Sequence, residues 1–98
     1  MPALVIVEIE IEDPVAYEAY KKLTPATIEA FGGRFVVRGA STHSLEGEWN
    51  PQSLVVLEFP DVETAHQWWN SEAYGEAKRI RQKAARTKML VVESHPLL

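Results

Sequence analysis

The sequence contains no cysteine among its 98 residues. Disulfides, thiolate metal sites, iron–sulfur clusters and cysteine nucleophiles are therefore excluded. It also has no apolar run near the roughly 18 residues that a membrane-spanning helix needs, and its start, Met-Pro-Ala-Leu-Val, lacks the basic region of a secretory signal. We therefore expect a cytoplasmic protein without a membrane partner.

No block of like charge is present either. The formal net charge is -4, and the basic residues gather mainly between Lys78 and Lys88, which argues against nucleic acid as a partner. His43, His66 and His95 are far apart and show no metal-ligand spacing, so we predict no metal site. No G-x-G-x-x-G fingerprint occurs, so a nucleotide is not expected. We predict no cofactor.

What is present is an ordinary globular composition, with 46% hydrophobic and 24% charged residues. This length fits one domain over residues 1–98. A chain of this size buries roughly 60 to 65% of its unfolded surface, which leaves a monomer only marginally stable. A partner subunit would add the missing burial.

The first half of the chain predicts a strand, a helix and a second strand. Residues 3–11 alternate with a period of two, which is typical of a strand. Asp13 and Pro14 then provide a cap and a first helical residue for a helix to about Phe31. Because Pro25 lies inside this helix, we expect a kink or a break near Thr24. The next strand follows two glycines and spans residues 34–39.

The second half predicts a strand over residues 53–59, a helix from Asp61 to about Arg86, and a strand over 88–94. A long loop joins the middle two strands into an antiparallel hairpin. Ser71 is a candidate internal cap of the second helix. The apolar stripe expected to face the sheet is Val62, Ala65, Trp69, Ala73, Ala77, Ile80 and Ala84.

The resulting order, βαββαβ, is that of the split-βαβ motif. We therefore predict an α+β, ferredoxin-like fold with a four-stranded antiparallel sheet and two helices on one face. The other face would expose Leu4, Ile6, Leu54 and Val56, a patch too apolar for a soluble monomer. A second copy of the sheet is expected to cover it, which makes the protein a homodimer.

Arg38 is the charged residue most in need of a partner, because its strand is expected to be covered on both sides. Arg34 is expected on the same face. The favoured interpretation is an ion pair with Glu58, Glu46 or Glu8. The alternative is a clamp for a carboxylate or enolate ligand at the mouth of a pocket.

The aromatic residues suggest a pocket or an interface. Trp68 and Trp69 point about 100° apart on a helix, so Trp69 is expected in the core and Trp68 at a pocket or an interface. Trp49 lies in a polar loop, which favours an interface or a lid. The predicted ligand-binding set is Tyr17, Arg38, Glu46, Trp49, Glu58, Trp68 and Tyr74, and no catalytic residue is assigned.

Four segments, 32–39 (GGRFVVRG), 45–49 (LEGEW), 58–60 (EFP) and 68–74 (WWNSEAY), together resemble the domain of unknown function 1330 family. The resemblance covers nearly the whole chain. It implies a ferredoxin-like fold that pairs into a dimeric α/β barrel, a superfamily that includes cofactor-independent monooxygenases, muconolactone isomerases and haem-handling enzymes. Many of those monooxygenases carry a histidine shortly after the tryptophan segment, where Lys78, Arg79 and Arg81 stand here.

The sequence thus predicts a homodimer that binds a small aromatic or anionic organic molecule between sheet and helices, oriented by Arg38. The alternatives are a cofactor-independent monooxygenase- or isomerase-like enzyme and a non-catalytic structural dimer. Fold alone does not choose among them.

Overall fold

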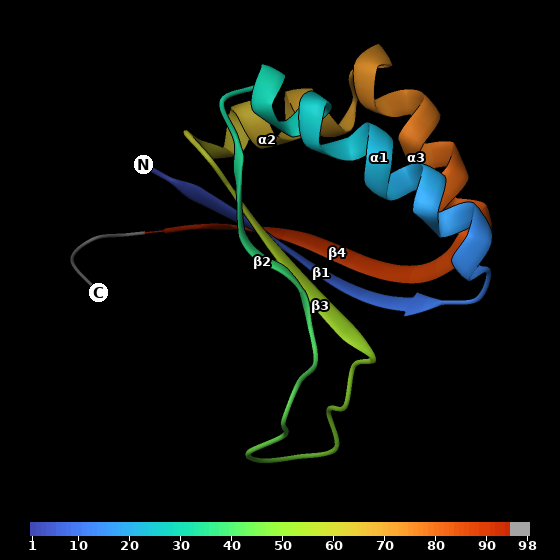
Figure 1. Ribbon diagram of the computed structural model, residues 1–98. Helices are drawn as coiled ribbons and strands as arrows, with labels where there is room; N and C mark the ends of the chain where they lie inside the picture. The colour runs from blue at the N-terminus through green and yellow to red at the C-terminus, as the bar shows by residue number, and fades with distance from the viewer. Residues whose placement is uncertain (95–98) are drawn as a thin grey trace.

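The computed structural model describes residues 1–94 and contains one antiparallel sheet with the strand order β2-β3-β1-β4 (Figure 1). The elements are β1 Ala3–Ile11, α1 Pro14–Ala30, β2 Arg34–Ala40, β3 Ser53–Phe59, α2 Val62–Trp69, α3 Glu72–Ala84 and β4 Ala85–Glu93. The predicted ferredoxin-like α+β fold is confirmed. None of the helices in residues 1–94 is long and apolar enough to cross a membrane.

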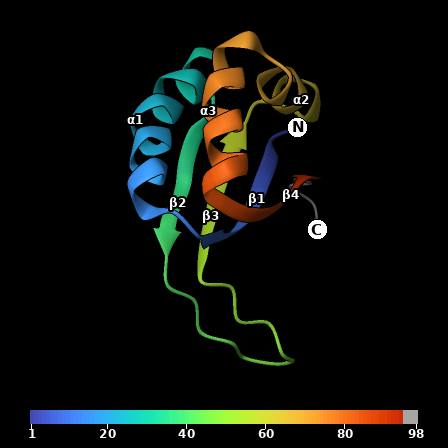
Figure 2. The ribbon, with the colours of Figure 1, turned by 90° about the vertical axis from the view of Figure 1, so that its right-hand side faces the viewer.

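The helices form a layer over one face of the sheet, with α1 and α3 side by side (Figure 2). The core lies between these two layers. It is built from alternate residues of the central strands and from one side of each helix: Val5, Val7, Ile9, Leu57, Phe59, Tyr17, Tyr20, Ile28, Ala65, Trp68, Tyr74, Ala77 and Ala84. We call the opposite face of the sheet, which carries Ile6 and Val56, the open face.

Helix α1 begins where the sequence predicts, since the Asp13 carboxylate accepts a hydrogen bond of 3.1 Å from the Ala16 N–H. The helix then continues through Pro25 to Ala30, so of the kink or break expected near Thr24 the break is absent. Buried residues lie on both sides of Pro25, among them Thr24 and Ile28. Their burial offsets the backbone hydrogen bond that proline removes.

The second predicted helix is two helices. Asn70 ends α2, and the Ser71 hydroxyl caps α3 by accepting from the Tyr74 N–H at 3.1 Å, which confirms the internal cap. This break shifts the buried stripe, so Trp68 is 1% exposed and Trp69 is 39% exposed. The expectation that Trp69 lies in the core is therefore wrong. The final strand begins at Ala85, directly after α3 and earlier than predicted.

One irregularity in β2, between Phe35 and Val37, turns its side chains over, and a second one, between Arg38 and Ala40, turns them back. Arg34 pairs with Glu58 and Phe35 with Leu57, but the next pair joins Val37 to Val56, so β2 has one extra residue at this point. Arg38 then pairs with Val55. A shift of one residue in the register of a strand moves each following side chain to the opposite face of the sheet. Arg34 consequently lies on the open face and Arg38, although exposed, on the helix side of the sheet, so the expectation that they share a face is wrong.

An apolar row crosses the open face from one edge of the sheet to the other. Val37 of β2 pairs with Val56 of β3, which pairs with Ile6 of β1, which pairs with Leu90 of β4. Leu90 is 55% exposed in the single chain. Figure 1 shows that the helices lie entirely on the other side. This row therefore has no cover from the described part of its own chain.

Candidate functional site

A cavity of about 430 Å³ lies between α1 and the sheet. We call it the α1 cavity. Its walls are mostly apolar, because the strands contribute Val7, Ile9, Val55 and Leu57 from the face that would otherwise pack against a helix. Its aromatic lining residues are Tyr17, Tyr20, Phe35 and Trp68. A more open groove of about 870 Å³ runs along β4, but the α1 cavity is the one that gathers sequence-predicted site residues.

Two cationic residues line this cavity, Lys21, which pairs with Glu18 at 3.0 Å, and the exposed Arg38. The guanidinium carbon of Arg38 lies 4.4 Å from the centroid of the Phe35 ring, so the cation stacks on an aromatic wall of the cavity. The β2 irregularity that turns Arg38 to the helix side of the sheet makes this stacking possible. Arg38 has no ion pair within residues 1–94. The favoured ion-pair interpretation is therefore wrong, and Glu58 pairs instead with Arg34 at 2.9 Å.

Tyr17 adds a hydrogen-bonding group inside the cavity. Its side chain is 6% exposed, and its ring centroid lies 5.2 Å from that of Tyr20. Burial raises the pKa of Tyr17, with the positive charge of Arg81 acting in the opposite direction, so the phenol stays neutral and keeps its proton. Its hydroxyl makes no hydrogen bond to any residue that the structure describes. It is therefore available to a ligand.

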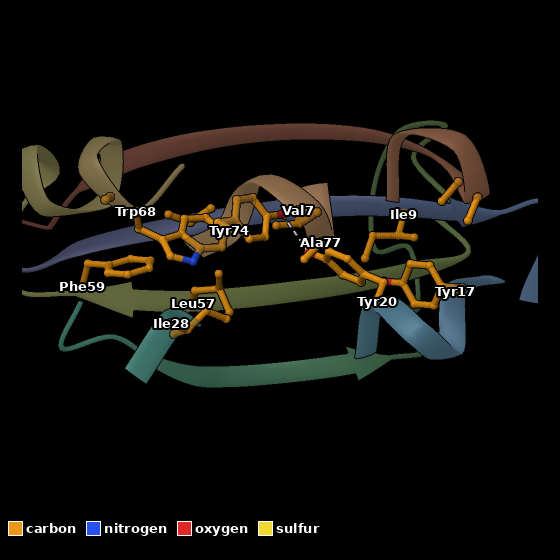
Figure 3. Packing of buried hydrophobic residues seen from close by; sticks show 14 residues of the cluster. Val7, Ile9, Tyr17, Tyr20, Ile28, Leu57, Phe59, Trp68, Tyr74 and Ala77 are labelled. Atoms are coloured by element: carbon orange, nitrogen blue, oxygen red, sulfur yellow. Dashed lines mark hydrogen bonds between the residues drawn. The ribbon is translucent and has the colours of Figure 1, made fainter. Parts of the chain in front are cut away.

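Trp68 lines the cavity and lies between Phe59 and Tyr74 in the buried cluster (Figure 3). Its ring centroid lies 4.1 Å from that of Tyr74 and 5.2 Å from that of Phe59. The indole N–H donates to the Thr27 hydroxyl of α1 at 3.1 Å. Because its polar atom is satisfied by protein, Trp68 contributes a rigid apolar wall rather than a hydrogen bond.

Tyr74 lies behind this wall and does not line the α1 cavity. Its hydroxyl lies 2.8 Å from the Tyr20 hydroxyl and accepts from the Arg81 Nε at 3.2 Å. Arg81 also donates through Nη1 to the Thr87 hydroxyl. Sequence reasoning missed Arg81, although a signal existed. Its spacing from Tyr74 and Ala77 places it on the buried stripe of α3, where an arginine is unusual.

The remaining predicted residues lie elsewhere. Glu46 and Trp49 belong to the loop between β2 and β3, which extends away from the sheet, and Trp49 is 58% exposed. Glu58 is on the open face with Arg34. The structure thus brings together Tyr17, Arg38 and Trp68 and does not bring Glu46, Trp49 or Glu58 to them. The expectation about His95 lies outside the described residues.

The α1 cavity combines three chemical properties. It offers apolar walls to a flat molecule, a neutral phenol that can donate or accept a hydrogen bond, and a guanidinium that attracts a carboxylate. Within residues 1–94, no carboxylate or imidazole lines it, and no group of three or more His, Asp or Glu side chains is placed to hold a metal ion. The arrangement is therefore suited to binding an anion, and it supplies no conventional proton acceptor.

Comparison with known proteins gives a family and a fold. The family model described as Domain of unknown function (DUF1330) matches residues 2–95. A search of curated proteins gave no match. Among solved structures, a protein of unknown function from Rhodopseudomonas palustris superposes with a TM-score of 0.75 at 20% identity, covering 96% of this chain and 82% of the other.

Two further structures have the same fold. A dimeric ferredoxin-like protein of unknown function from Jannaschia sp. CCS1 has a TM-score of 0.74 at 12% identity, covering 96% of this chain and all of the other. SnoaB, a cofactor-independent oxygenase from Streptomyces nogalater, has a TM-score of 0.67 at 8% identity, covering 96% of this chain and 93% of the other. At these identities the likeness extends to the fold alone.

Proposed function

Because this chain belongs to the DUF1330 family, whose description assigns no activity, we propose a function from its own geometry: a homodimeric protein that binds a small aromatic carboxylate in the α1 cavity. One observation carries the proposal. Arg38 is turned to the helix side of the sheet, where this exposed residue lines an apolar cavity, and it has no carboxylate partner in residues 1–94.

The size of the cavity suits such a ligand. Ligand pockets in proteins measure roughly 300 to 1,000 Å³ and combine apolar walls with a few polar groups, and the α1 cavity of about 430 Å³ falls in this range. A flat aromatic ring would lie between Tyr17 and Phe35, and its carboxylate would meet Arg38. A guanidinium forms charge-assisted, often bidentate hydrogen bonds with a carboxylate.

The dimer is proposed from the open face. The row from Val37 to Leu90 would pack against the same row of a second copy, and an antiparallel sheet with an apolar outer face is normally covered in this way. Charged pairs flank the row, with Arg34 and Glu58 toward one end and Glu8 opposite Lys88 toward the other. An apolar centre with a charged rim is the usual anatomy of an interface. The dimeric Jannaschia protein supports the proposal.

Cofactor-independent oxygenation is a second candidate function. The similarity in fold to the Streptomyces oxygenase favours it, together with an aromatic cavity able to exclude water. Against it stands the lack of a proton acceptor among the described lining residues. Oxygen consumption with a polycyclic phenol would distinguish the two, since a binding protein consumes none.

The first test is a native mass spectrum of the protein as purified from cells. We expect a dimer of twice the 11.0 kDa chain mass, with additional mass where ligand has co-purified. The second is calorimetric titration with 2-naphthoate. Arg38→Gln should weaken binding about tenfold or more through the lost charge-assisted bonds. Arg34→Gln removes the same charge from the open face and should leave binding unchanged. Equal affinities in the two variants would overturn the proposal.

A further inference from the structure

The groove along β4 lies between the helices and the β4 side of the sheet, and it shares Trp68 and Met89 with the lining of the α1 cavity. We call it the β4 groove. It is lined by α2, α3 and β4 and measures about 870 Å³. Trp68, Met89 and Val91 form part of its apolar lining, and Trp69 lies at its exposed side. Arg81 lines it from α3.

Arg81 is the only charged residue that is buried among residues 1–94, with 3% of its surface exposed. Its Nε donates to Tyr74 and its Nη1 to Thr87. A guanidinium has five N–H groups, so three are left after these two bonds. No fully buried side-chain nitrogen in this part of the chain lacks a partner, so the remaining nitrogen of Arg81 keeps some exposure, and Arg81 lines the groove.

Nothing in the described residues neutralises this charge. Arg81 forms no ion pair with an aspartate or glutamate of residues 1–94. The nearby phenols do not replace a carboxylate, because burial raises the pKa of both Tyr17 and Tyr20 by more than Arg81 lowers it. Both tyrosines are therefore uncharged at neutral pH. Arg81 remains a buried cation with neutral partners.

Such a cation is costly for a protein that gains nothing from it. Burying an unpaired charge carries a large desolvation cost, which neutral hydrogen bonds only partly offset. An anion in the adjoining groove would offset the rest. The groove favours one, because its other titratable lining residues are His66 and Arg86, with no aspartate or glutamate among those described.

We propose that the β4 groove is a second ligand site, in which the free N–H groups of Arg81 receive the carboxylate of a small aromatic acid. The aromatic part would lie on Trp68 and Met89, next to the Trp69 indole. These apolar surfaces distinguish the site from one for an inorganic anion, which would gain nothing from them. The Trp69 ring also makes a cation–π contact with Lys78, whose Nζ lies 3.6 Å from the ring centroid.

The test uses the unmodified protein and two probes that differ in charge but hardly in shape, benzoate and benzamide. The Nε–H of Arg81 and the indole N–H of Trp69 are followed by ¹H–¹⁵N NMR during titration with each probe. Benzoate should shift both signals in a saturable way, with a dissociation constant about tenfold or more below that of benzamide. Equal affinities, or benzoate shifts absent from these two signals, would overturn the proposal.

Substitutions then separate this site from the α1 cavity. Arg81→Gln should abolish the benzoate preference at the Trp69 signal. Arg79→Gln removes the same charge from an exposed position of α3 and should preserve it. Arg38→Gln should also preserve it, even where it abolishes binding in the α1 cavity. If Arg81→Gln does not fold, the comparison of benzoate with benzamide on the unmodified protein decides alone. Loss of the preference in Arg38→Gln would assign the binding to the α1 cavity and overturn the second site.

Discussion

The hydroxyl oxygens of Tyr20 and Tyr74 lie 2.8 Å apart inside the helix layer, where they join α1 to α3. The two residues are 54 positions apart in the sequence, and both are buried. Tyr74 also accepts from Arg81. The network therefore has a centre, Tyr74, which holds two partners, and an end, Tyr20, whose hydroxyl bonds to one side chain. It runs from Tyr20, which lines the α1 cavity, to Arg81, which lines the β4 groove.

This asymmetry predicts different costs for two matched substitutions. Tyr74→Phe removes the acceptor of the buried Arg81 Nε, and an unsatisfied buried group of this kind costs about 2 to 3 kcal/mol in the free energy of unfolding. Tyr20→Phe removes one neutral hydrogen bond and should cost about 1 kcal/mol. Urea denaturation of both variants measures the difference. Equal costs would show that Arg81 draws no stability from Tyr74.

Tyr17→Phe should behave in the opposite way to Tyr74→Phe. The Tyr17 hydroxyl bonds to no residue that the structure describes, so its removal should change the free energy of unfolding by less than about 0.5 kcal/mol. It should nevertheless weaken the binding of a ligand that hydrogen-bonds in the α1 cavity, by about fivefold. Urea denaturation and calorimetry with 2-naphthoate test the two halves. Unchanged affinity would exclude the Tyr17 hydroxyl from ligand recognition.

The element order and the sheet could be predicted because each rests on a local pattern, such as the alternation over residues 3–11 or the Asp13 cap. The side of the sheet or helix on which an individual side chain lies could not be predicted in this way. Arg38 changes face because β2 holds one residue more than β3 at a point that no local signal marks. Trp68, and not Trp69, lies in the core, because the single helix expected from the sequence is divided at Asn70 into α2 and α3. Each shift is small along the chain, yet it decides which residues reach the site.

The roles of the two tryptophans can be tested directly. Trp68→Ala leaves a cavity beside Phe59 and Tyr74 and removes the hydrogen bond that the indole donates to the Thr27 hydroxyl, so it should cost about 3 to 5 kcal/mol. Trp69→Ala removes a partly exposed ring and should cost about 1 kcal/mol or less. Thermal or urea unfolding distinguishes them. The reverse order would restore the core position that the sequence assigned to Trp69.

The Asp61 cap of α2 predicts a pH dependence. Hydrogen bonding from the Thr64 side chain, followed by the hydrogen bond of 2.7 Å from the Thr64 N–H, lowers the pKa of Asp61 below its usual value. A carboxylate with a lowered pKa stabilises the folded state above its unfolded pKa, and this contribution disappears as the pH falls through the folded pKa. The stability difference between the wild type and Asp61→Ala should therefore be largest near neutral pH and shrink in acid. A pH-independent difference would exclude the charge as its cause.

Ile6 provides the sharpest test of the dimer, because it lies in the middle of the apolar row, between Val56 and Leu90. In a dimer formed through the open face, Ile6→Glu would place a carboxylate from each copy in an apolar interface, where burying unpaired charge is strongly unfavourable. The variant should be a monomer at micromolar concentration by light scattering. Leu45→Glu makes the same chemical change at a fully exposed loop residue and should remain a dimer. If the Ile6→Glu variant is still a dimer, the interface lies on another surface. If the wild type itself is a monomer, the apolar row is uncovered and the proposed dimer does not form.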